Sequence, residues 1–251
     1  MTPKARQARI SDAVSQRGQM SVDMIVELFG ISHETARRDL TALEKAGALV
    51  KVHGGARLAQ PVEEEPFARR LKVNAAAKRL IASKAATLAK PKDVLFIDTG
   101  STTLLLAEEL AKVVDLTVFT NCARIARVID QSGTGSTAIL LPGRFRSGND
   151  QTIGPMTVKA IAALSAKIAF LTVGAVDATF GASDYDVDEA EIASAMVAAS
   201  ERCVLLADRS KFDRKVSYRV TPLNGIHTLV CDQPPEKALH AALMRSETSI
   251  M

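Results

Sequence analysis

The sequence predicts an α/β protein of two domains, a small one made mostly of helices and a larger one built on a mostly parallel sheet. Helical patterns and a Gly-Gly turn fill the first 57 residues. Two prolines bracket an acidic run in the segment 60–66, which is typical of a linker. Beyond it, short apolar strands alternate with helical patterns, as they do in parallel sheets whose two faces are covered.

The first domain is expected to hold three helices followed by a hairpin. Apolar spacing predicts the helices at residues 4–17, 22–29 and 33–45. Ser21 and Ser32 stand where the N-caps of the second and third helices belong. Gly54-Gly55 joins two short strands within residues 49–57. Three helices and a hairpin in this order form a winged helix-turn-helix pattern, so we place this domain at residues 1–57.

The larger domain is expected at residues 76–251, after a linker at residues 58–75. Its strands are predicted at residues 94–97, 116–119, 138–141, 168–173, 203–206 and 228–231. Its helices are predicted at residues 104–112, 122–130, 157–164 and 189–199. Because strands and helices alternate, the sheet should be mostly parallel.

Composition excludes several classes of protein. Of the 251 residues, 47% are hydrophobic, enough to bury a substantial core, and 8 Phe with 2 Tyr are too few for base-stacking platforms. No apolar run approaches the roughly 18 residues of a membrane span, and none follows the first basic residues as in a secretory signal. The three cysteines are far apart, which argues against a disulfide framework and a zinc site. We therefore expect a soluble cytoplasmic protein with no metal or other cofactor.

The first domain also holds the candidate DNA contacts. Residues 1–60 contain nine Lys/Arg against six Asp/Glu, whereas the rest of the chain contains 23 against 22. The start of a recognition helix presents its side chains to base edges and phosphates in the major groove. The candidates are Ser32, His33, Thr35, Arg37, Arg38, His53 and Arg57. The alternative is a solvated helix whose arginines pair with Glu34 and Asp39, but the preceding helix and the following hairpin favour DNA.

Hydroxyl and amide groups follow two predicted strands of the larger domain, at the edge where ligands bind in such sheets. The run 98–103, Asp-Thr-Gly-Ser-Thr-Thr, offers hydroxyls and free N–H groups that suit a phosphate. Thr120 and Asn121 follow the next strand, and Lys211 follows a later one. The structural alternatives are helix caps for the hydroxyls and, for Lys211, a surface lysine beside Asp208.

Acidic residues crowd a loop and the start of the helix predicted at 189–199. They are Asp177, Asp184, Asp186, Asp188, Glu189 and Glu191. A favourable interaction with the helix dipole is a sufficient reason for several of them. Carboxylates that face a pocket would instead accept hydrogen bonds from sugar hydroxyls.

An ordered series of motifs resembles the DeoR family of bacterial transcriptional regulators. In the first domain the series consists of Arg9-Ile10, Arg37-Arg38-Asp39-Leu40, Leu43, Gly47 and His53-Gly54-Gly55-Ala56. Beyond it the series consists of Pro66-Phe67, Arg70, Asn74, Lys78, Asp98-Thr99-Gly100-Ser101-Thr102-Thr103, Thr120-Asn121, Gly181, Asp186, Glu189-Ala190-Glu191 and Asp208-Arg209-Ser210-Lys211-Phe212. The resemblance covers nearly the whole chain.

The resemblance implies a DNA-binding repressor with a sensor domain that resembles ribose-5-phosphate isomerase and binds a phosphorylated sugar or polyol. Together with the strand-end argument, it implies effector contacts from Asp98, Gly100, Ser101, Thr102, Thr103, Thr120, Asn121, Gly143, Arg144, Asp177, Asp186, Glu189 and Lys211. Pro142-Gly143-Arg144 replaces a Gly-Gly pair that the family often has, which leaves the geometry there open. Asp184-Tyr185-Asp186 with Glu189, and Asp232-Gln233, resemble the family's glycerol-3-phosphate repressors.

The leading interpretation is a repressor that binds double-stranded operator DNA and is released by a phosphorylated sugar or glycerol 3-phosphate. A homodimer or homotetramer, paired through the larger domain, is expected because one winged head contacts only a few base pairs. The alternative is a sugar-phosphate isomerase-like enzyme with an N-terminal DNA-binding extension, using Asp177, Glu189 and Lys211 as acids and bases. A DNA-architectural protein is the third possibility. A winged head has no purpose in an isomerase, and a sensor-like domain has none in an architectural protein, so we expect a regulator that is not an enzyme.

Overall fold

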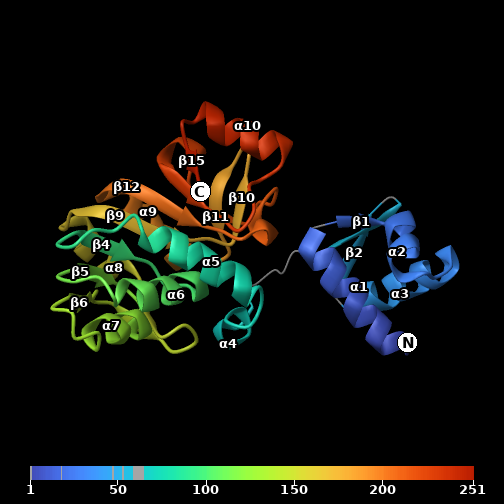
Figure 1. Cartoon of the computed structure of the whole chain (residues 1–251), viewed down its shortest axis with the longest axis horizontal. Coiled ribbons are helices and arrows are strands. Elements are labelled where there is room, and N and C mark those ends of the chain that lie inside the picture. Colours follow the sequence, from blue (N-terminus) through green and yellow to red (C-terminus); the bar gives the residue numbers. More distant parts are fainter. Residues whose placement is uncertain (1, 18, 47, 53, 59–64) are drawn as a thin grey trace. The chain divides into compact units, whose positions relative to one another are not determined.

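Figure 1 shows a computed structural model of the chain, which describes residues 2–17, 19–46, 48–52, 54–58 and 65–251. The chain forms two compact units, Met1–Val62 and Glu63–Met251. We call the first unit the head and the second the body, and each is described by itself.

The head contains three helices and a three-stranded antiparallel sheet. They are α1 (Pro3–Arg17), α2 (Val22–Phe29), α3 (His33–Lys45), β1 (Gln19–Ser21), β2 (Leu49–Val52) and β3 (Gly55–Leu58), with the strands in the order β1-β3-β2. Ser21 caps α2 by accepting a hydrogen bond of 3.1 Å from the N–H of Met24, and Ser32 caps α3 through the N–H of Thr35 at 3.2 Å. The helices and hairpin form where they were predicted. Strand β1 was not predicted, because three residues that pair only with the distant β3 leave no local pattern.

One face of each head helix packs into a common apolar core. The core consists of Ile10, Val14, Met20, Val22, Ile25, Ala36, Leu40, Leu43, Leu49 and Ala56. On α3, the residues Ala36, Leu40 and Leu43 share the buried face because they are three or four positions apart. Arg37 and Arg38 are therefore exposed on the outer side of this helix.

The body is built on a seven-stranded sheet in which every pairing is parallel. Its strands, in the order of the sheet, are β15 (Ser249–Ile250), β14 (Thr228–Val230), β12 (Ser200–Leu206), β9 (Ala166–Thr172), β4 (Val94–Ile97), β5 (Thr117–Thr120) and β6 (Thr137–Leu140). All six predicted strands form, with shifts of a few residues at their ends. The edge strand β15 was missed, since two residues are too few to show alternation.

Helices cover both faces of this sheet (Figure 1). One face packs against α5 (Ala75–Ala86), α6 (Ser101–Leu110) and α7 (Ala123–Asp130). The other face packs against α8 (Pro155–Ala162), α9 (Val187–Ala198) and α10 (Lys237–Arg245). Along β4, Leu95 and Ile97 enter the first layer and Phe96 the second, as the alternation of a doubly covered strand requires. The predicted α/β class is confirmed.

Short elements complete the body. They are α4 (Phe67–Arg70), the antiparallel hairpin β7 (Arg144–Arg146) and β8 (Gln151–Ile153), a small sheet of β10 (Ala175–Asp177), β11 (Gly181–Asp184) and β13 (Tyr218–Thr221), and the 3-10 turns η1 (Arg209–Lys211) and η2 (Leu223–Gly225). Helix α4 lies within the segment expected to be a linker, and its Phe67 is only 2% exposed. Part of the segment expected to be a linker, residues 58–75, therefore belongs to the body.

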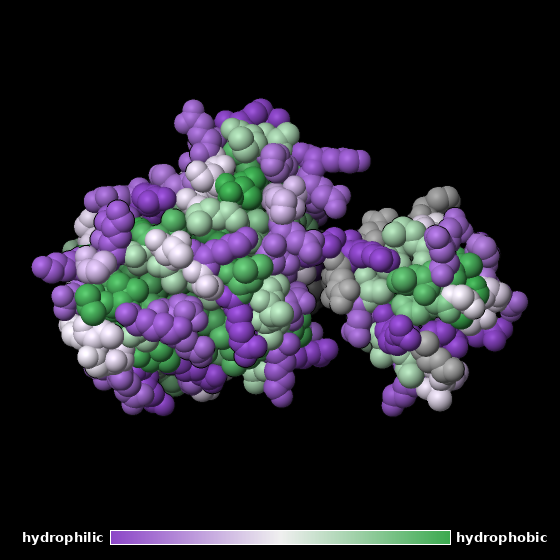
Figure 2. Space-filling model, in the orientation of Figure 1, coloured by the Kyte–Doolittle hydropathy of each residue, from purple (hydrophilic) through white to green (hydrophobic). Residues whose placement is uncertain are grey.

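The visible face of each unit is largely polar (Figure 2). Figure 2 shows hydrophilic side chains over much of the visible face of each unit, with apolar side chains between them in small groups. Scattered exposed apolar residues of this kind are normal for folded proteins. Among the described residues, no helix is both long enough and apolar enough to cross a membrane.

Candidate DNA and effector sites

The predicted DNA contacts lie at the start of α3 and on β3, except for His53, which lies outside the described residues. The hydroxyls of Ser32 and Thr35 are 2.9 Å apart in the cap of α3. Nε2 of His33 lies 2.9 Å from a carboxylate oxygen of Asp23 on α2, and both side chains are largely exposed. Arg57 lies on β3 and is half-buried. The cap thus orders the end of the helix that would enter a groove.

The charged groups of α3 divide between the surface and the head core. Arg38 pairs with Glu34 at 2.9 Å on the solvent side, whereas Arg37 has no ion-pair partner among the described residues. Asp39 faces inward and is 2% exposed. It accepts hydrogen bonds from Arg6 at 2.6 and 3.3 Å and from Gln7 at 2.9 Å. Asp39 is thus held by residues of α1. The solvated-helix alternative had expected it to pair with the neighbouring arginines of α3.

In the body, several candidate effector residues follow the carboxyl ends of the neighbouring strands β4 and β5 of the parallel sheet. The chain runs from β4 outward to β5 and β6, and then returns to place β9 on the other side of β4. The order therefore reverses between β4 and β9, at the carboxyl ends of these strands. The run 98–103 leaves β4 at this point. Ligands in open α/β sheets bind at such reversals.

Residues 98–103 form a tight loop and the first turn of α6. The helix begins at Ser101, three residues earlier than predicted, so Ser101, Thr102 and Thr103 all lie in its first turn. All three are at least 95% buried. Gly100 precedes them, and a Cβ at this position would lie 2.1 Å from Oγ1 of Thr172 at the end of β9. A glycine here lets the loop lie directly against β9.

Thr120 ends the neighbouring strand β5, Asn121 follows it, and both are fully buried. The hydroxyl of Thr120 accepts a hydrogen bond of 3.1 Å from the N–H of Cys122. The amide nitrogen of Asn121 points toward Gln151 and the carbonyl oxygen of Thr152, at 3.5 and 3.4 Å. The amide oxygen of Asn121 has no hydrogen-bond partner among the described residues. Buried polar atoms are normally paired, so this oxygen is suited to a ligand donor.

Glu189 is held by residues that the sequence analysis missed. Its Oε1 accepts hydrogen bonds from Arg146 at 3.4 Å, from Asn149 at 3.1 Å and from Gln151. These three donors come from the hairpin of β7 and β8. Asp186 caps α9 through the N–H of Glu189 at 3.2 Å and accepts a hydrogen bond from Arg146 at 3.0 Å. The hairpin is too short for a periodic signal, and its only cue was the polar run 146–151.

Lys78 is a second group that was not among the predicted effector contacts. It lies on α5 and is 6% exposed. Its Nζ donates to Oγ of Ser101 at 3.0 Å and to the carbonyl oxygen of Arg70. A buried ammonium thus adjoins the first turn of α6. The sequence held a signal for it, because Lys78 is one of the residues that match the DeoR pattern.

The remaining predicted residues have other surroundings. Asp177 closes the turn after β10, since one of its oxygens accepts hydrogen bonds from Thr179 and Phe180. Burial raises its pKa, but these hydrogen bonds outweigh burial and the pKa is lowered. Lys211 ends η1, is half-buried and has no ion-pair partner among the described residues. Gly143 has a φ of 158°, and the largely exposed Arg144 pairs with Asp188 at 3.3 Å.

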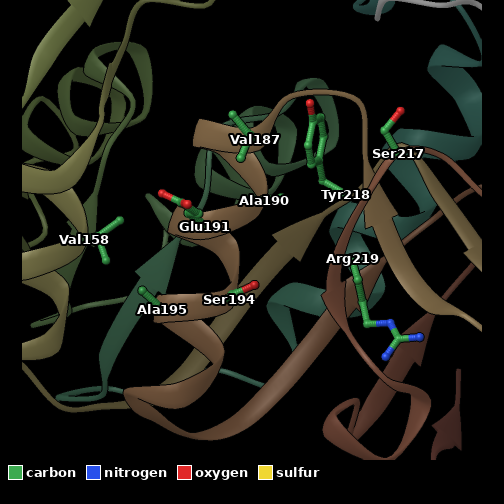
Figure 3. A pocket seen from close by; sticks show the side chains of 9 residues that line it. All are labelled: Val158, Val187, Ala190, Glu191, Ser194, Ala195, Ser217, Tyr218 and Arg219. Atoms are coloured by element: carbon green, nitrogen blue, oxygen red, sulfur yellow. The ribbon is translucent and has the colours of Figure 1, made fainter.

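A separate groove of about 510 Å³ runs along the outer side of α9 (Figure 3). Its lining residues are Val158, Val187, Ala190, Glu191, Ser194, Ala195, Ser217, Tyr218 and Arg219. None of the predicted effector contacts is among them. Helix α9 therefore contributes Glu189 to the hairpin contacts and presents other residues to this groove.

The three cysteines are free and buried. Burial raises the pKa of Cys203 to about 12 and that of Cys231 to about 11, and it also raises the pKa of Cys122. Thiolates are the reactive form, and burial disfavours the thiolate of all three side chains. No group of three or more metal-ligating side chains occurs in the part of the chain that the structure describes.

Comparisons with known proteins find relatives that span nearly the whole length of the chain. The HTH-type transcriptional repressor CsqR of Escherichia coli is 27% identical over 252 residues, covering 100% of this chain and 96% of its own. The glycerol-3-phosphate regulon repressor of E. coli is 28% identical over 235 residues, covering 94% of this chain and 93% of its own. Among solved structures, ribose-5-phosphate isomerase A from Methanocaldococcus jannaschii matches 55% of each chain with a TM-score of 0.40 and 17% identity.

Two family models match this chain, in agreement with the ordered motifs and with the two units. The DeoR-like helix-turn-helix domain matches residues 6–62, which include most of α1 and all of α2 and α3. The DeoR C-terminal sensor domain matches residues 73–233, which include all of the candidate effector residues. The chain therefore belongs to the DeoR family of helix-turn-helix transcriptional regulators.

Proposed function

We propose that this regulator represses a carbohydrate or polyol catabolic operon and leaves its operator DNA when a phosphorylated sugar or glycerol 3-phosphate binds to the body. The observation that carries the proposal is the buried polar site at the reversal between β4 and β9. There a hydroxyl-rich helix start, a buried lysine and an amide oxygen without a partner occur at one sheet edge. Relatives named as repressors, one of them of the glycerol-3-phosphate regulon, support it.

The polar groups at this edge differ in chemistry along the site, in a way that suits a small phosphorylated polyol. Residues 100–103 offer the N–H groups and hydroxyls of a helix start, which attract a phosphate. Asp98, Asp186 and Glu189 offer carboxylate oxygens, which accept hydrogen bonds from hydroxyl groups. We propose Thr120 and Asn121 as contacts between the two ends, and Lys211 as a further cation for the phosphate.

We also propose that the body binds its ligand without converting it. The isomerase alternative needs Asp177, Glu189 and Lys211 as acids and bases acting on one substrate. Asp177 is engaged by the N–H groups of its own turn, and Glu189 accepts hydrogen bonds from three donors of the hairpin. Groups already held in this way suit binding better than proton transfer. Operator binding by a homodimer or homotetramer remains part of the proposal, because two heads on one duplex gain affinity through effective concentration.

The test begins by selecting duplexes for the full-length protein from a randomised DNA pool. The affinity for the selected duplex is then measured with glycerol 3-phosphate, with ribose 5-phosphate and with glycerol and ribose as matched controls. We expect one phosphorylated compound to weaken DNA binding and its unphosphorylated form to have no effect. If the two forms weaken DNA binding equally, the phosphate group does not contribute to recognition, and this part of the proposal is wrong. Turnover of ribose 5-phosphate by the purified protein would favour the isomerase alternative.

A further inference from the structure

Both ends of the candidate effector site make hydrogen bonds that lead to the same residue, Arg70. It is the last residue of α4, which is the first body helix after the segment that joins head and body. From the helix-start end, Nζ of Lys78 bridges Oγ of Ser101 and the carbonyl oxygen of Arg70. From the carboxylate end, Asn149 donates to Glu189 at 3.1 Å and accepts a hydrogen bond of 3.1 Å from Nη2 of Arg70.

Helix α4 also contacts the body through the ring of Phe67 and the guanidinium of Arg70. Its Phe67 is buried, and the guanidinium carbons of Arg70 and Arg124 lie 5.2 and 4.7 Å from the centre of the ring. Arg124 is fixed in turn by Asp150, the neighbour of Asn149 in the hairpin, at 2.7 Å. A four-residue helix has little stability of its own, so its position depends on these contacts.

We propose that Arg70 is a positioning residue that couples ligand binding in the body to the chain segment leading to the head. The proposal rests on the function proposed above and adds how the signal leaves the site. A ligand hydroxyl that donates to Glu189 competes with Asn149 for the same carboxylate. A phosphate at the start of α6 attracts the ammonium of Lys78 away from the carbonyl oxygen of Arg70. Both changes loosen α4, the first described helix after the segment that joins head and body.

The exposed neighbour Arg69 provides a matched control. It lies on the same helix and carries the same charge, but it pairs with Glu65 at 3.0 Å and its side chain is 70% exposed. Arg70→Ala removes the contact with Asn149 and the stacking on Phe67, whereas Arg69→Ala removes only a surface ion pair. Arg70→Lys keeps the charge and most of the stem but lacks the guanidinium fork, and it tests the same contact in a chain that keeps more of the packing.

The first measurement is hydrogen exchange of the full-length protein with and without glycerol 3-phosphate, or ribose 5-phosphate if that is the compound that releases DNA. In the wild type and in Arg69→Ala, we expect the ligand to speed exchange of the amides in α4. In Arg70→Ala and Arg70→Lys, exchange there should be fast without ligand and unchanged by it. Slower or unchanged exchange in the ligand-bound wild type would overturn the proposal.

The second measurement separates coupling from binding. Calorimetry gives the affinity of each variant for the ligand, and titration of the selected duplex gives the ligand's effect on DNA affinity, which for coupled sites is roughly 5- to 150-fold. We expect the Arg70 variants to bind the ligand within a few-fold of the wild type while losing most of that effect. A full wild-type effect in Arg70→Lys would refute the coupling role. If the wild type itself shows no effect of phosphorylated ligands, the proposed function fails first.

Discussion

Asp39 on α3 and Arg6 on α1 form an ion pair inside the head, with 2.6 Å between Oδ2 of Asp39 and Nε of Arg6. This contact ties the candidate recognition helix to the first helix of the domain. Burial by itself raises the pKa of Asp39, but the hydrogen bonds from Arg6 and Gln7 outweigh it and lower the pKa below its ordinary value. The hydrogen bond to Asp39 raises the pKa of Arg6.

Asp39→Asn should therefore destabilise the head by about 2 kcal/mol, as expected for hydrogen bonds to a charged group. The lowered pKa means that the stabilisation is complete above the ordinary carboxyl pKa of about 4 and is lost as the pH falls through the lower pKa of the folded head. Hydrogen exchange of the α3 amides at several pH values measures both effects. Asp12→Asn, an exposed change on α1, is the control. Equal stability of both variants at neutral pH would contradict the assignment.

Arg37→Ala and Arg38→Ala should each weaken binding to the selected duplex while leaving the fold intact, since both side chains are exposed. A lost base contact costs about 1–3 kcal/mol in discrimination, whereas a lost phosphate contact lowers affinity for all sequences and reduces the salt dependence. Titrations at several salt concentrations distinguish the two. Arg245→Ala, an exposed change on α10, should have no effect. Wild-type affinity in both Arg37→Ala and Arg38→Ala would rule out the predicted DNA contacts.

Gly100→Ala should destabilise the body and abolish ligand binding, because the new Cβ would lie 2.1 Å from Oγ1 of Thr172. Overpacking of this kind costs about 1–3 kcal/mol. Adding Thr172→Ala removes the clashing atom and should restore part of the melting temperature. Gly148→Ala is the control, since nothing lies within 4 Å of a Cβ there. If Gly100→Ala melts like the wild type, the loop does not depend on its contact with β9.

The double variant Thr102→Ala, Lys211→Ala should bind the phosphorylated ligand at least tenfold more weakly, because it loses a hydroxyl and a cation from the proposed phosphate end. Calorimetry with the phosphorylated compound and its unphosphorylated form measures the loss. Lys159→Ala, an exposed lysine on α8, controls for the change in net charge. Wild-type affinity in the double variant would show that the phosphate binds elsewhere.

Sedimentation of the full-length protein should show a dimer or tetramer at the concentrations that saturate the selected duplex. One winged head reads only a few base pairs, so tight binding needs two heads on one duplex. A monomer that binds with the same affinity would contradict this prediction.

Local sequence determined the elements whose signals lie within one helix or strand. The serine caps of α2 and α3, the apolar stripe of α3 and the six predicted strands depend on residues a few positions apart, so periodicity and capping chemistry reveal them. The hydroxyl-rich run after β4 was predictable for the same reason. The start of α6 was misplaced by three residues because Ser, Thr and Thr serve equally well before a helix and in its first turn.

Tertiary structure decided which distant groups meet. Thirty-three residues separate Asp39 from Arg6, and 40 separate Glu189 from Asn149. No local pattern encodes such pairs, because they form only when the core brings α1 to α3 and the hairpin of β7 and β8 to α9. The reversal between β4 and β9 likewise follows from strand order, which packing and chain connectivity set together. The sequence could therefore nominate Asp98 to Thr103 and Glu189, whereas the contacts that Lys78, Asn149 and Gln151 make with these residues emerged only from the fold.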